Sequence, residues 1–306
     1  MRVVIAGGSG LIGRAVAAPL AAAGKDVVVL SRDPDRVRGL PAGVRAARWD
    51  GHSAAGWEAL LEAGSAVINL AGEAIAAGRW TEERKRRIRA SRVDAGRAVV
   101  DAVRLAAEAG RAPAVVLQAS GIGYYGDAGD REVDEDSPPG ADFLAAASVA
   151  WEASSAEIET LGVRRVLLRT GVVLDRDGGA LRKMLPPFRL GLGGPLGGGR
   201  QWFPWIHMAD EAGAILFLLA AEAASGPFNL CAPRPVRSRD FARALGKQLH
   251  RPSILPVPAP ALRLALGELA AALLGGQRAN PRRLLAAGYR FRFPDLPEAL
   301  ADLLAP

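Results

Sequence analysis

The sequence predicts an α/β protein built on a doubly wound parallel sheet, with a smaller helical lobe at its carboxyl end. Glycines at positions 7, 10 and 13 separate an apolar, β-branched run, Val3–Ala6, from a helical pattern, Leu11–Ala23. Short apolar runs then alternate with helical patterns as far as Arg169, which is typical of parallel strands joined by right-handed crossovers. After Thr170 the chain becomes rich in glycine and then in proline, so a second region begins there.

The glycine turn favours a dinucleotide site of the Rossmann type, although the same turn would also serve helix–strand packing alone. Gly7 permits the tight turn, Gly10 lets the main chain approach a pyrophosphate, and Gly13 allows the helix to lie close to the strand. The free N–H groups and partial positive charge of the helix N-terminus would face the phosphates. The residues that we assign to the cofactor from this turn are Gly7, Ser9, Gly10, Leu11, Ile12 and Gly13.

The remaining elements follow from apolar runs, capping residues and breakers. Gly24 ends the first helix, and Thr81 caps a long helix, or a pair of helices, with acidic residues in its first turn. Further strands are expected over Asp26–Leu30, Val44–Trp49, Ala66–Leu70, Ala114–Gln118, Arg165–Arg169 and Pro227–Leu230. Further helices are expected around Trp57–Ala63, from Thr81 to about Ala109, over Phe143–Thr160 and Asp210–Ala221, and in the segment after Ser238.

These elements divide the chain into three regions. Residues 1–172, which 206–230 rejoin, form the dinucleotide-binding domain, and residues 173–205 form a loop or lid. Residues 231–306 form a helical substrate lobe over the carboxyl ends of the strands, where ligands bind in doubly wound sheets. Gly191–Gly199 is expected to be a loop, and with the aromatic stretch Trp202–Trp205 it would act as a lid that excludes water.

Composition excludes several classes of protein. Hydrophobic residues make up 50% of the chain, the single cysteine fits a reducing compartment, and no apolar stretch is long enough to span a membrane. No leader precedes the first strand, so we expect a cytoplasmic protein. The net charge is +7, but the basic run Arg84–Arg92 lacks interleaved aromatic residues, so it indicates a solvated helix face rather than nucleic-acid binding. The 3 histidines are scattered, so no metal site is expected.

The end of the second strand selects the cofactor. Proteins that bind NAD usually carry an acidic residue there to hold the ribose 2′-hydroxyl. This chain has Ser31 and Arg32 instead, which would accept a 2′-phosphate. We therefore expect NADP(H), although Asp33 lies beside this pair and an exposed loop arginine is the alternative. Asp50, after the third strand, would meet the adenine edge or, alternatively, form an Asx turn with Gly51.

The ends of the fourth and fifth strands would meet the nicotinamide half of the cofactor. The stretch after the fourth strand consists of Leu70, Ala71, Gly72 and Glu73. It either runs close to the cofactor, with Glu73 pointing into the cleft, or forms a glycine-alanine turn that serves packing alone. After the fifth strand, Ser120 and Tyr124 are candidate catalytic groups, because a tyrosine can act as a general acid where a cation lowers its pKa. For Tyr125 we expect aromatic packing.

Longer blocks of the sequence resemble the extended short-chain dehydrogenase/reductase superfamily. They include the glycine turn, NLAG at 69–72, YYG at 124–126, and the run from LRTGVVLD to GLGGPLGGGRQWFPWIH. Within that superfamily they are similar to the NAD-dependent epimerase/dehydratase family. The tail from ILPVPAPALRLALGELA to FRFPDL resembles that family's C-terminal domain of unknown function.

The resemblance implies NADP(H) as cofactor, Ser31 and Arg32 at its 2′-phosphate, and Leu70 and Ala71 beside it. It also implies a phosphate role for Arg92, for which a surface arginine is the alternative. Finally, it implies a homodimer through the helices after strands four and five, a habit of the superfamily. It further places Val173 at the nicotinamide half.

One departure from the superfamily concerns catalysis. The superfamily carries a tyrosine, followed four residues later by a lysine, on the helix after strand five, where the lysine lowers the pKa of the phenol. Here that helix reads DFLAAASVAWEASS, and alignment on Glu152 places Leu144 and Ser148 at the two positions. A substitute acid would have to come from Ser120, Tyr124, Glu73 or His207. For His207 the alternative is a structural hydrogen bond.

Two functions therefore stay open. The first is an NADP(H)-binding oxidoreductase or epimerase-like protein that acts on an unidentified small molecule through an atypical proton relay. The second is a non-catalytic, NADP(H)-dependent sensor or interaction protein, for example one linked to cell division, which the missing tyrosine and lysine favour. Consumption of NADPH separates the two.

Overall fold

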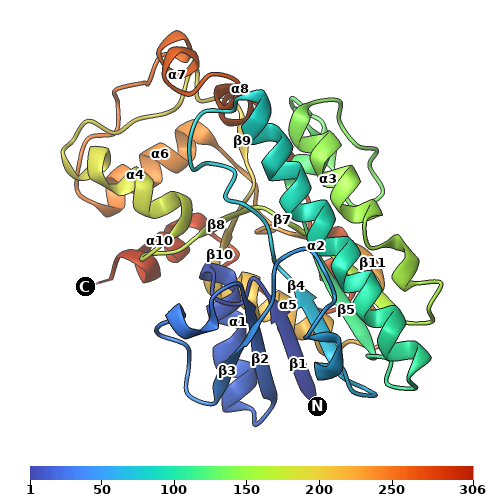
Figure 1. Cartoon of the computed structure of the whole chain (residues 1–306). Coiled ribbons are helices and arrows are strands. Elements are labelled where there is room, and N and C mark those ends of the chain that lie inside the picture. Colours follow the sequence, from blue (N-terminus) through green and yellow to red (C-terminus); the bar gives the residue numbers. More distant parts are fainter. Residues whose placement is uncertain (306) are drawn as a thin grey trace.

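The computed structural model describes residues 1–305, and a parallel sheet forms the centre of this part of the chain (Figure 1). Its strands are β1 (Arg2–Ala6), β2 (Asp26–Ser31), β3 (Val44–Arg48), β4 (Ala66–Asn69), β5 (Val115–Gly121), β7 (Arg164–Thr170) and β11 (Gly226–Leu230). They lie in the order β11-β7-β5-β4-β1-β2-β3, and every neighbouring pair is parallel. The predicted doubly wound sheet is confirmed.

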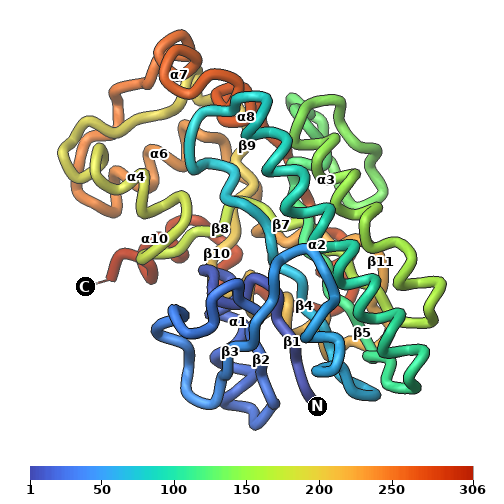
Figure 2. Tube along the Cα trace, in the orientation of Figure 1, coloured from blue at the N-terminus to red at the C-terminus, as the bar shows by residue number. Residues whose placement is uncertain are grey.

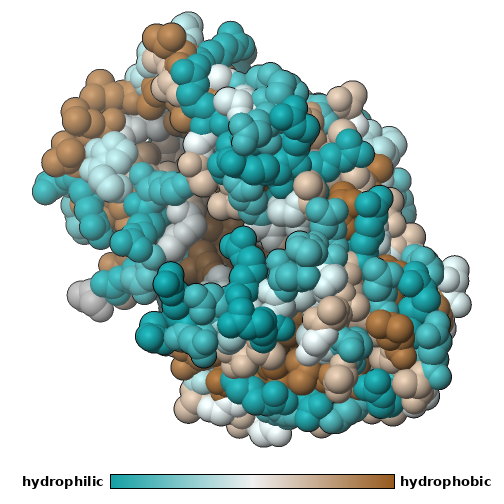
Figure 3. Space-filling view, in the orientation of Figure 1, coloured by the Kyte–Doolittle hydropathy of each residue, from teal (hydrophilic) through white to brown (hydrophobic). Residues whose placement is uncertain are grey.

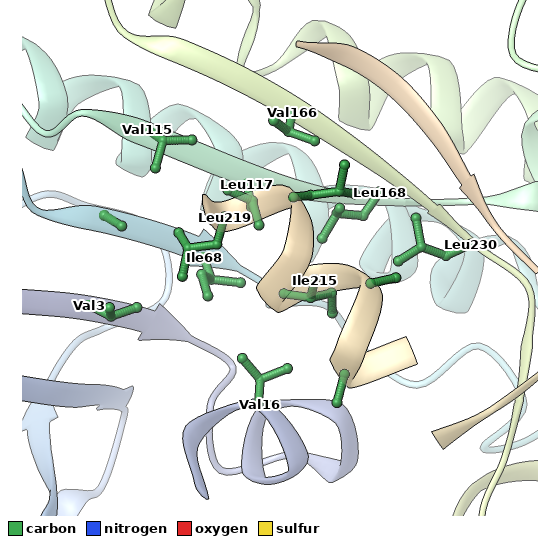
Figure 4. Packing of buried hydrophobic residues seen from close by; sticks show 14 of the residues in the cluster. Val3, Val16, Ile68, Val115, Leu117, Val166, Leu168, Ile215, Leu219 and Leu230 are labelled. Atoms are coloured by element: carbon green, nitrogen blue, oxygen red, sulfur yellow. The ribbon is translucent and has the colours of Figure 1, made fainter. Parts of the chain in front are cut away.

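Helices cover both faces of the sheet. On one face α1 (Leu11–Ala22) and α5 (Met208–Ala220) lie together, and they enclose a core with β1, β4, β5 and β7. Figure 4 shows Val16 of α1 and Ile215 and Leu219 of α5 against the apolar side chains of these strands. On the other face α2 (Glu82–Glu108) and α3 (Phe143–Ala153) lie side by side, and α2 packs into a second core.

The predicted long helix is a single helix, α2, and its cap is confirmed. The Thr81 hydroxyl accepts a hydrogen bond from the Arg84 N–H at 3.2 Å, and Glu82 and Glu83 occupy the first turn. The tube in Figure 2 shows the segment between β4 and α2, in cyan, rising between α2 and the lobe before the helix begins. This segment therefore borders the space above the sheet.

Two expected helices are shorter in the structure. The helix expected over Phe143–Thr160 ends at Ala153, and a single 3-10 turn, Ala156–Ile158, follows. Its last carbonyls are taken by side chains, because the Ser154 hydroxyl donates to the Trp151 carbonyl at 2.6 Å. The helix expected around Trp57–Ala63 is a 3-10 turn, Glu58–Leu60, because glycines with positive φ at 56 and 64 bracket the segment.

The remaining elements build the lobe above the carboxyl ends of the strands (Figure 1). Its helices are α4 (Gly179–Arg189), α6 (Ser238–Gln248), α7 (Ala259–Leu266), α8 (Leu269–Leu274) and α10 (Leu296–Leu304). The short helix α9 (Arg282–Ala286) instead packs beside β11 of the sheet. Short strands pair β8 (Val172–Leu174) with β10 (Trp205–His207), β9 (Trp202–Phe203) with β12 (Val236–Arg237), and β6 (Glu132–Val133) with β13 (Arg278–Ala279).

The segment 173–205, expected to be a loop or lid, contains one helix that sequence analysis missed. Leu181, Leu185 and Phe188 lie on one face of α4 and pack into a third core with α6 and α10. Pro186 and Pro187 lie inside this helix, and adjacent prolines argue against a helix in any sequence pattern. The glycine-rich part, 191–199, is a loop, as expected. Among residues 1–305, no helix combines the length and the hydropathy needed to cross a membrane.

Candidate cofactor and substrate site

The turn between β1 and α1 touches the end of β4 at the point where the order of the strands reverses. Gly7 has a φ of 75°, and a Cβ placed on it would lie 2.8 Å from the Leu70 carbonyl carbon. Only glycine fits this close approach of two main chains. Because ligands of doubly wound sheets bind at such reversal points, the turn lies where a dinucleotide would bind.

The first turn of α1 is free to meet an anion. Gly10 is the N-cap residue and offers no capping side chain, and the main-chain N–H groups of Leu11, Ile12 and Gly13 have no hydrogen-bond acceptor within residues 1–305. Arg14 stabilises the glycine turn, since its Nε donates to the Ser9 carbonyl at 2.8 Å. Unpaired amides at a helix N-terminus form a ready site for phosphate.

Guanidinium groups lie at the ends of β2 and β3. Arg32 is exposed and has no carboxylate within ion-pair distance among residues 1–305, because the neighbouring Asp33 pairs with Arg36 at 3.2 Å. The Ser31 hydroxyl accepts from the Asp33 N–H at 3.2 Å. Arg48, which sequence analysis missed, lies beside Ser31 in the register and donates to the Arg32 carbonyl at 3.3 Å. The ends of β2 and β3 therefore carry positive charge, as a 2′-phosphate site requires.

Asp50 adopts the alternative role of an Asx turn. Its carboxylate accepts from the N–H groups of His52 and Ser53, each at 2.8 Å, and from the Ser53 hydroxyl at 2.5 Å. Burial acts to raise the pKa of Asp50, but these hydrogen bonds outweigh it and hold the pKa at about 2. The contact with adenine stays a prediction.

The stretch after β4 separates into residues near the cleft and one that turns away. Leu70 lines the cavity described below, and the Ala71 N–H donates to the buried Asn69 side chain at 3.2 Å. Gly72 lies against Arg92, and a Cβ on it would lie 3.2 Å from that side chain. Glu73, expected to point into the cleft, is absent from the lining among residues 1–305, because its carboxylate pairs with Arg84 of α2 at 3.1 Å.

Arg92 is buried, so the alternative of a surface arginine is wrong. Its side chain is 7% exposed, stacks over the Trp151 ring at 4.8 Å, and donates from Nη1 to the carbonyls of Glu73 and Ile88. Among residues 1–305, no carboxylate oxygen lies within 4.0 Å of its guanidinium, and burial lowers its pKa to about 10. A desolvated cation without a carboxylate partner favours binding of an anion.

A cavity of about 520 Å³ extends from the glycine turn into the lobe. On the face seen in Figure 3, the surface is hollowed between the part that carries α4 and α10 and the part that carries α1, and apolar residues lie inside. The sheet side of the wall contains Ile12, Leu70, Ser120, Thr170 and Val172. The other side contains residues of α3, α4, the loop 191–199, β9, α6 and α8, including Leu144, Ser148, Trp151, Met184, Phe188, Leu196, Trp202, Phe203, Phe241, Leu269 and Leu273.

Ser120 is the predicted catalytic residue that reaches this wall. Its hydroxyl donates to Glu152 Oε1 at 2.6 Å, and Glu152 in turn accepts two hydrogen bonds from Arg169. Arg169 also donates to the Tyr125 hydroxyl at 2.9 Å, and Tyr125 donates to Asn229 at 2.8 Å. Packing of Tyr125 is thus confirmed. Burial raises the pKa of Tyr125, so it stays a neutral phenol.

Tyr124 and His207 are not brought to the cavity. The Tyr124 ring lies under the Arg169 guanidinium at 3.5 Å and is missing from the lining among residues 1–305. His207 is the N-cap of α5, where its Nδ1 accepts from the Ala209 N–H at 3.0 Å, and its ring lies 4.0 Å from that of Phe293. Burial lowers its pKa. The structural alternative therefore holds for His207.

The end of β7 holds a buried acid that sequence analysis missed. Thr170 lines the cavity and donates to Glu211 Oε1 of α5 at 2.8 Å. Glu211 is fully buried, its Oε2 has no partner within residues 1–305, and burial raises its pKa to about 8. Val172 lines the cavity, whereas the Val173 side chain packs towards the core of α1 and α5, because neighbouring residues of a strand face opposite sides. The contact of Val173 with the nicotinamide stays a prediction.

A charged residue inside an apolar element was the available signal for Arg169 and for Glu152. Arg169 ends the apolar strand β7, and Glu152 lies in the alanine-rich helix α3, so each needed a partner of opposite charge. The sequence alone does not say which partner, since the two residues come from different elements. Metal-binding clusters of His, Cys, Asp or Glu do not occur among the residues that the structure describes.

Comparison with known proteins gives matches along nearly the whole chain. The NAD dependent epimerase/dehydratase family matches residues 3–231, and DUF1731, a domain of unknown function, matches 257–303. The mouse epimerase family protein SDR39U1 is 41% identical over 313 residues, covering 100% of both chains. Epimerase family protein Mb2239 of Mycobacterium bovis is 42% identical over 299 residues, covering 97% of this chain and 96% of its own. A crystal structure of human epimerase family protein SDR39U1 (isoform2) with NADPH has a TM-score of 0.88 and 36% identity, and 99% of each chain is covered.

Proposed function

The chain belongs to the NAD dependent epimerase/dehydratase family, and from this premise we propose that it is an NADP(H)-binding oxidoreductase or epimerase-like enzyme acting on a small molecule. One observation carries the proposal: Ile12 and Leu70 border both the glycine turn and the cavity, so a phosphate site and a substrate-sized space are continuous. The NADPH in the crystal structure of the human relative supports the choice of cofactor.

The residues present fit such a cofactor. The unpaired amides of Leu11, Ile12 and Gly13 would hold its pyrophosphate, Arg32 and Ser31 its 2′-phosphate, and the buried Arg92 a further anionic oxygen. Bound in this way, a nicotinamide supplies a donor or acceptor of hydride. The open position of Gly10, where a Cβ would meet only the Gly7 carbonyl oxygen at 3.2 Å, supports the same fit.

The atypical part of the site is its supply of protons. Leu144 and Ser148 lie in the wall at the positions where the superfamily has tyrosine and lysine, and among residues 1–305 the wall contains no Tyr, Lys or His. We assign the polar contact with substrate to Ser120, whose hydroxyl is held by Glu152. Such an arrangement orients a substrate oxygen, but the usual tyrosine that would transfer the proton is missing from the wall.

The second candidate, an NADP(H)-dependent sensor without turnover, is favoured by the missing tyrosine and lysine. Purified protein saturated with NADPH and offered a panel of carbonyl compounds and alcohols tests the choice. Oxidation of NADPH, followed at its absorbance band, supports the enzyme. Tight binding of NADPH without consumption across the panel supports the sensor, and absence of NADPH binding contradicts both.

A homodimer and a cytoplasmic location are further proposals of ours. The faces of α2 and α3 that would pair across a twofold axis form a shallow groove of about 580 Å³, lined by residues that include Arg86, Arg89 and Arg97. Arginines facing their own copies repel one another at low ionic strength. Sedimentation velocity at low and high salt therefore tests the dimer, which we expect to tighten with salt.

A further inference from the structure

We propose that the lobe side of the cavity binds an uncharged, largely apolar molecule with one or two hydrogen-bonding groups, and that it does not bind a nucleoside-diphosphate sugar. This inference rests on the proposed function, since it names the class of molecule that the same site accepts. It goes further because it follows from the wall of this chain alone. The inference does not depend on the word epimerase in the names of the relatives.

The wall on the lobe side is built from apolar side chains of several elements. Phe188 of α4, Phe203 of β9 and Phe241 of α6 form its aromatic part, and α3 contributes Leu144 and Trp151. Ile75, Ile88, Met184, Leu196, Leu269 and Leu273 fill the spaces between them. A surface of this kind gains free energy by covering apolar groups of a ligand, at about 25 cal/mol per Å².

The polar side chains in this wall are mostly committed to the protein itself. Gln201 Nε2 donates to the carbonyls of Leu196 and Leu273, each at 3.1 Å, and Gln277 Nε2 donates to the Gly126 carbonyl at 2.6 Å. The hydroxyls of Ser148 and Ser238 form no hydrogen bond with other groups among residues 1–305. These two hydroxyls, with the side-chain oxygens of Gln201 and Gln277, are therefore hydrogen-bonding groups that a ligand on the lobe side can meet.

The charge of the wall opposes a diphosphate. Among the described residues that line the cavity, one side chain is cationic, Arg92, and two are acidic, Asp127 and Asp142. Arg92 lies against Gly72 at the end of β4, so it belongs to the cofactor side. Asp142 occupies the N-terminus of α3, where its carboxylate accepts from the Ala145 N–H at 2.8 Å, so a negative charge stands where a phosphate would approach this helix.

Cations near the lobe side point elsewhere. The guanidinium of Arg237 lies over the Trp202 ring at 4.4 Å and pairs with Asp130 at 2.9 Å, and it does not line the cavity. Lys183 donates to the Ala76 carbonyl at 2.9 Å and is likewise outside the lining. A buried diphosphate that meets carboxylates and no cation loses its hydration without compensation. Nucleoside-diphosphate sugars are thereby excluded from the lobe side.

The test begins with NADPH and then adds probes. Calorimetric titration with NADPH examines the proposed function by itself. On the NADPH-saturated protein, we then measure binding of the neutral fluorophore N-phenyl-1-naphthylamine by its increase in emission, and its displacement by uncharged aromatic ketones or by UDP-glucose. We expect the fluorophore to bind, the ketones to displace it, and UDP-glucose at millimolar concentration to leave it in place.

Matched variants locate the binding in this cavity. Leu144→Asn, in the wall, should weaken fluorophore binding about tenfold, because it removes apolar contact and adds a buried amide. Val149→Asn, on an exposed face of the same helix, should leave binding unchanged within about twofold. Met184→Gln of α4 provides a second wall variant should Leu144→Asn fold poorly, and thermal melting monitors folding of each.

Displacement by UDP-glucose, or fluorophore binding that ignores both wall variants, would overturn the inference. Absence of heat with NADPH would instead overturn the proposed function, whatever the fluorophore does. The two failures are therefore distinguishable in the same set of samples.

Discussion

Arg169 and Glu152 face each other inside the protein through two parallel hydrogen bonds, Nε to Oε1 at 2.8 Å and Nη2 to Oε2 at 2.9 Å. Arg169 comes from the end of β7 and Glu152 from α3, and the two side chains are 4% and 11% exposed. The pair therefore fixes the helix to the sheet directly beside the cavity. It also fixes Ser120, since the same carboxylate accepts the serine hydroxyl.

The first prediction removes the charge of this pair. Glu152→Gln leaves the Arg169 guanidinium buried without a counter-charge, so we expect a loss of about 3–5 kcal/mol in the free energy of unfolding. The matched control is Glu159→Gln, whose carboxylate pairs with Arg165 but is 53% exposed, and which should lose less than about 1 kcal/mol. Urea denaturation measures both, and equal losses would contradict the buried pair as a stabilising contact.

The second prediction concerns the choice of cofactor. Arg32→Glu should weaken binding of NADPH by about 2 kcal/mol or more, because a charged hydrogen bond to the 2′-phosphate is lost, and should change binding of NADH far less. Arg243→Glu, an exposed change on α6, is the control for net charge. Titration calorimetry with both nucleotides decides the matter, and equal weakening of the two would remove the reason for assigning NADP(H).

The third prediction separates Arg92 from Arg32. Since Arg92 lies at the end of β4 rather than at the end of β2, Arg92→Gln should weaken NADPH and NADH alike, each by about tenfold or more. Arg89→Gln, on the outer groove of α2 and α3, should change neither affinity. A loss confined to NADPH would place Arg92 at the 2′-phosphate instead and would contradict this assignment.

The fourth prediction follows from the buried carboxyl of Glu211. Its pKa is about 8 in the fold, above the usual value near 4.5, so the folded state keeps a proton that the unfolded state releases. Stability of the wild-type protein therefore falls as pH rises from about 4.5 to about 8. Glu211→Gln removes this term, so its melting temperature should exceed that of the wild type increasingly between pH 5 and pH 8. A difference that does not vary with pH would show that Glu211 titrates normally.

The strands and the glycine turn could be predicted because they depend on neighbours in sequence. Short apolar runs mark β1 and β2, and a single threonine marks the cap at Thr81. The structure confirms all three. The groups that close the site depend on distant partners instead. The bond between Thr170 and Glu211 spans 41 positions, and no local pattern marks either residue. Pairs of short strands, such as β8 with β10, could not be predicted from the sequence either, since three residues show no periodicity.

The same reasoning explains which candidate catalytic residues failed to reach the cavity. Ser120 lies near the end of β5 and stays in the wall, whereas the 3-10 turn Ile122–Tyr125 that follows carries Tyr124 beneath Arg169. The Glu73 carboxylate is held away from the cavity by its ion pair with Arg84, a residue in the first turn of α2. Direction after a turn is a property of the folded chain, so residue type and spacing were insufficient to predict it.

The strand pair β6 and β13 has a consequence for how the tail should be handled in the laboratory. Arg278 and Ala279 run alongside Glu132 and Val133, Leu284 belongs to the core that the sheet forms with α1 and α5, and the Arg283 N–H donates to the Glu135 carboxylate. The region that matches DUF1731 is therefore no detachable module. Expressed alone, this region would lose the residues of the sheet that it packs against. A protein that ends before residue 257 would expose apolar residues to water and would tend to aggregate. Fusion or domain-swapping experiments should therefore keep both parts on one chain.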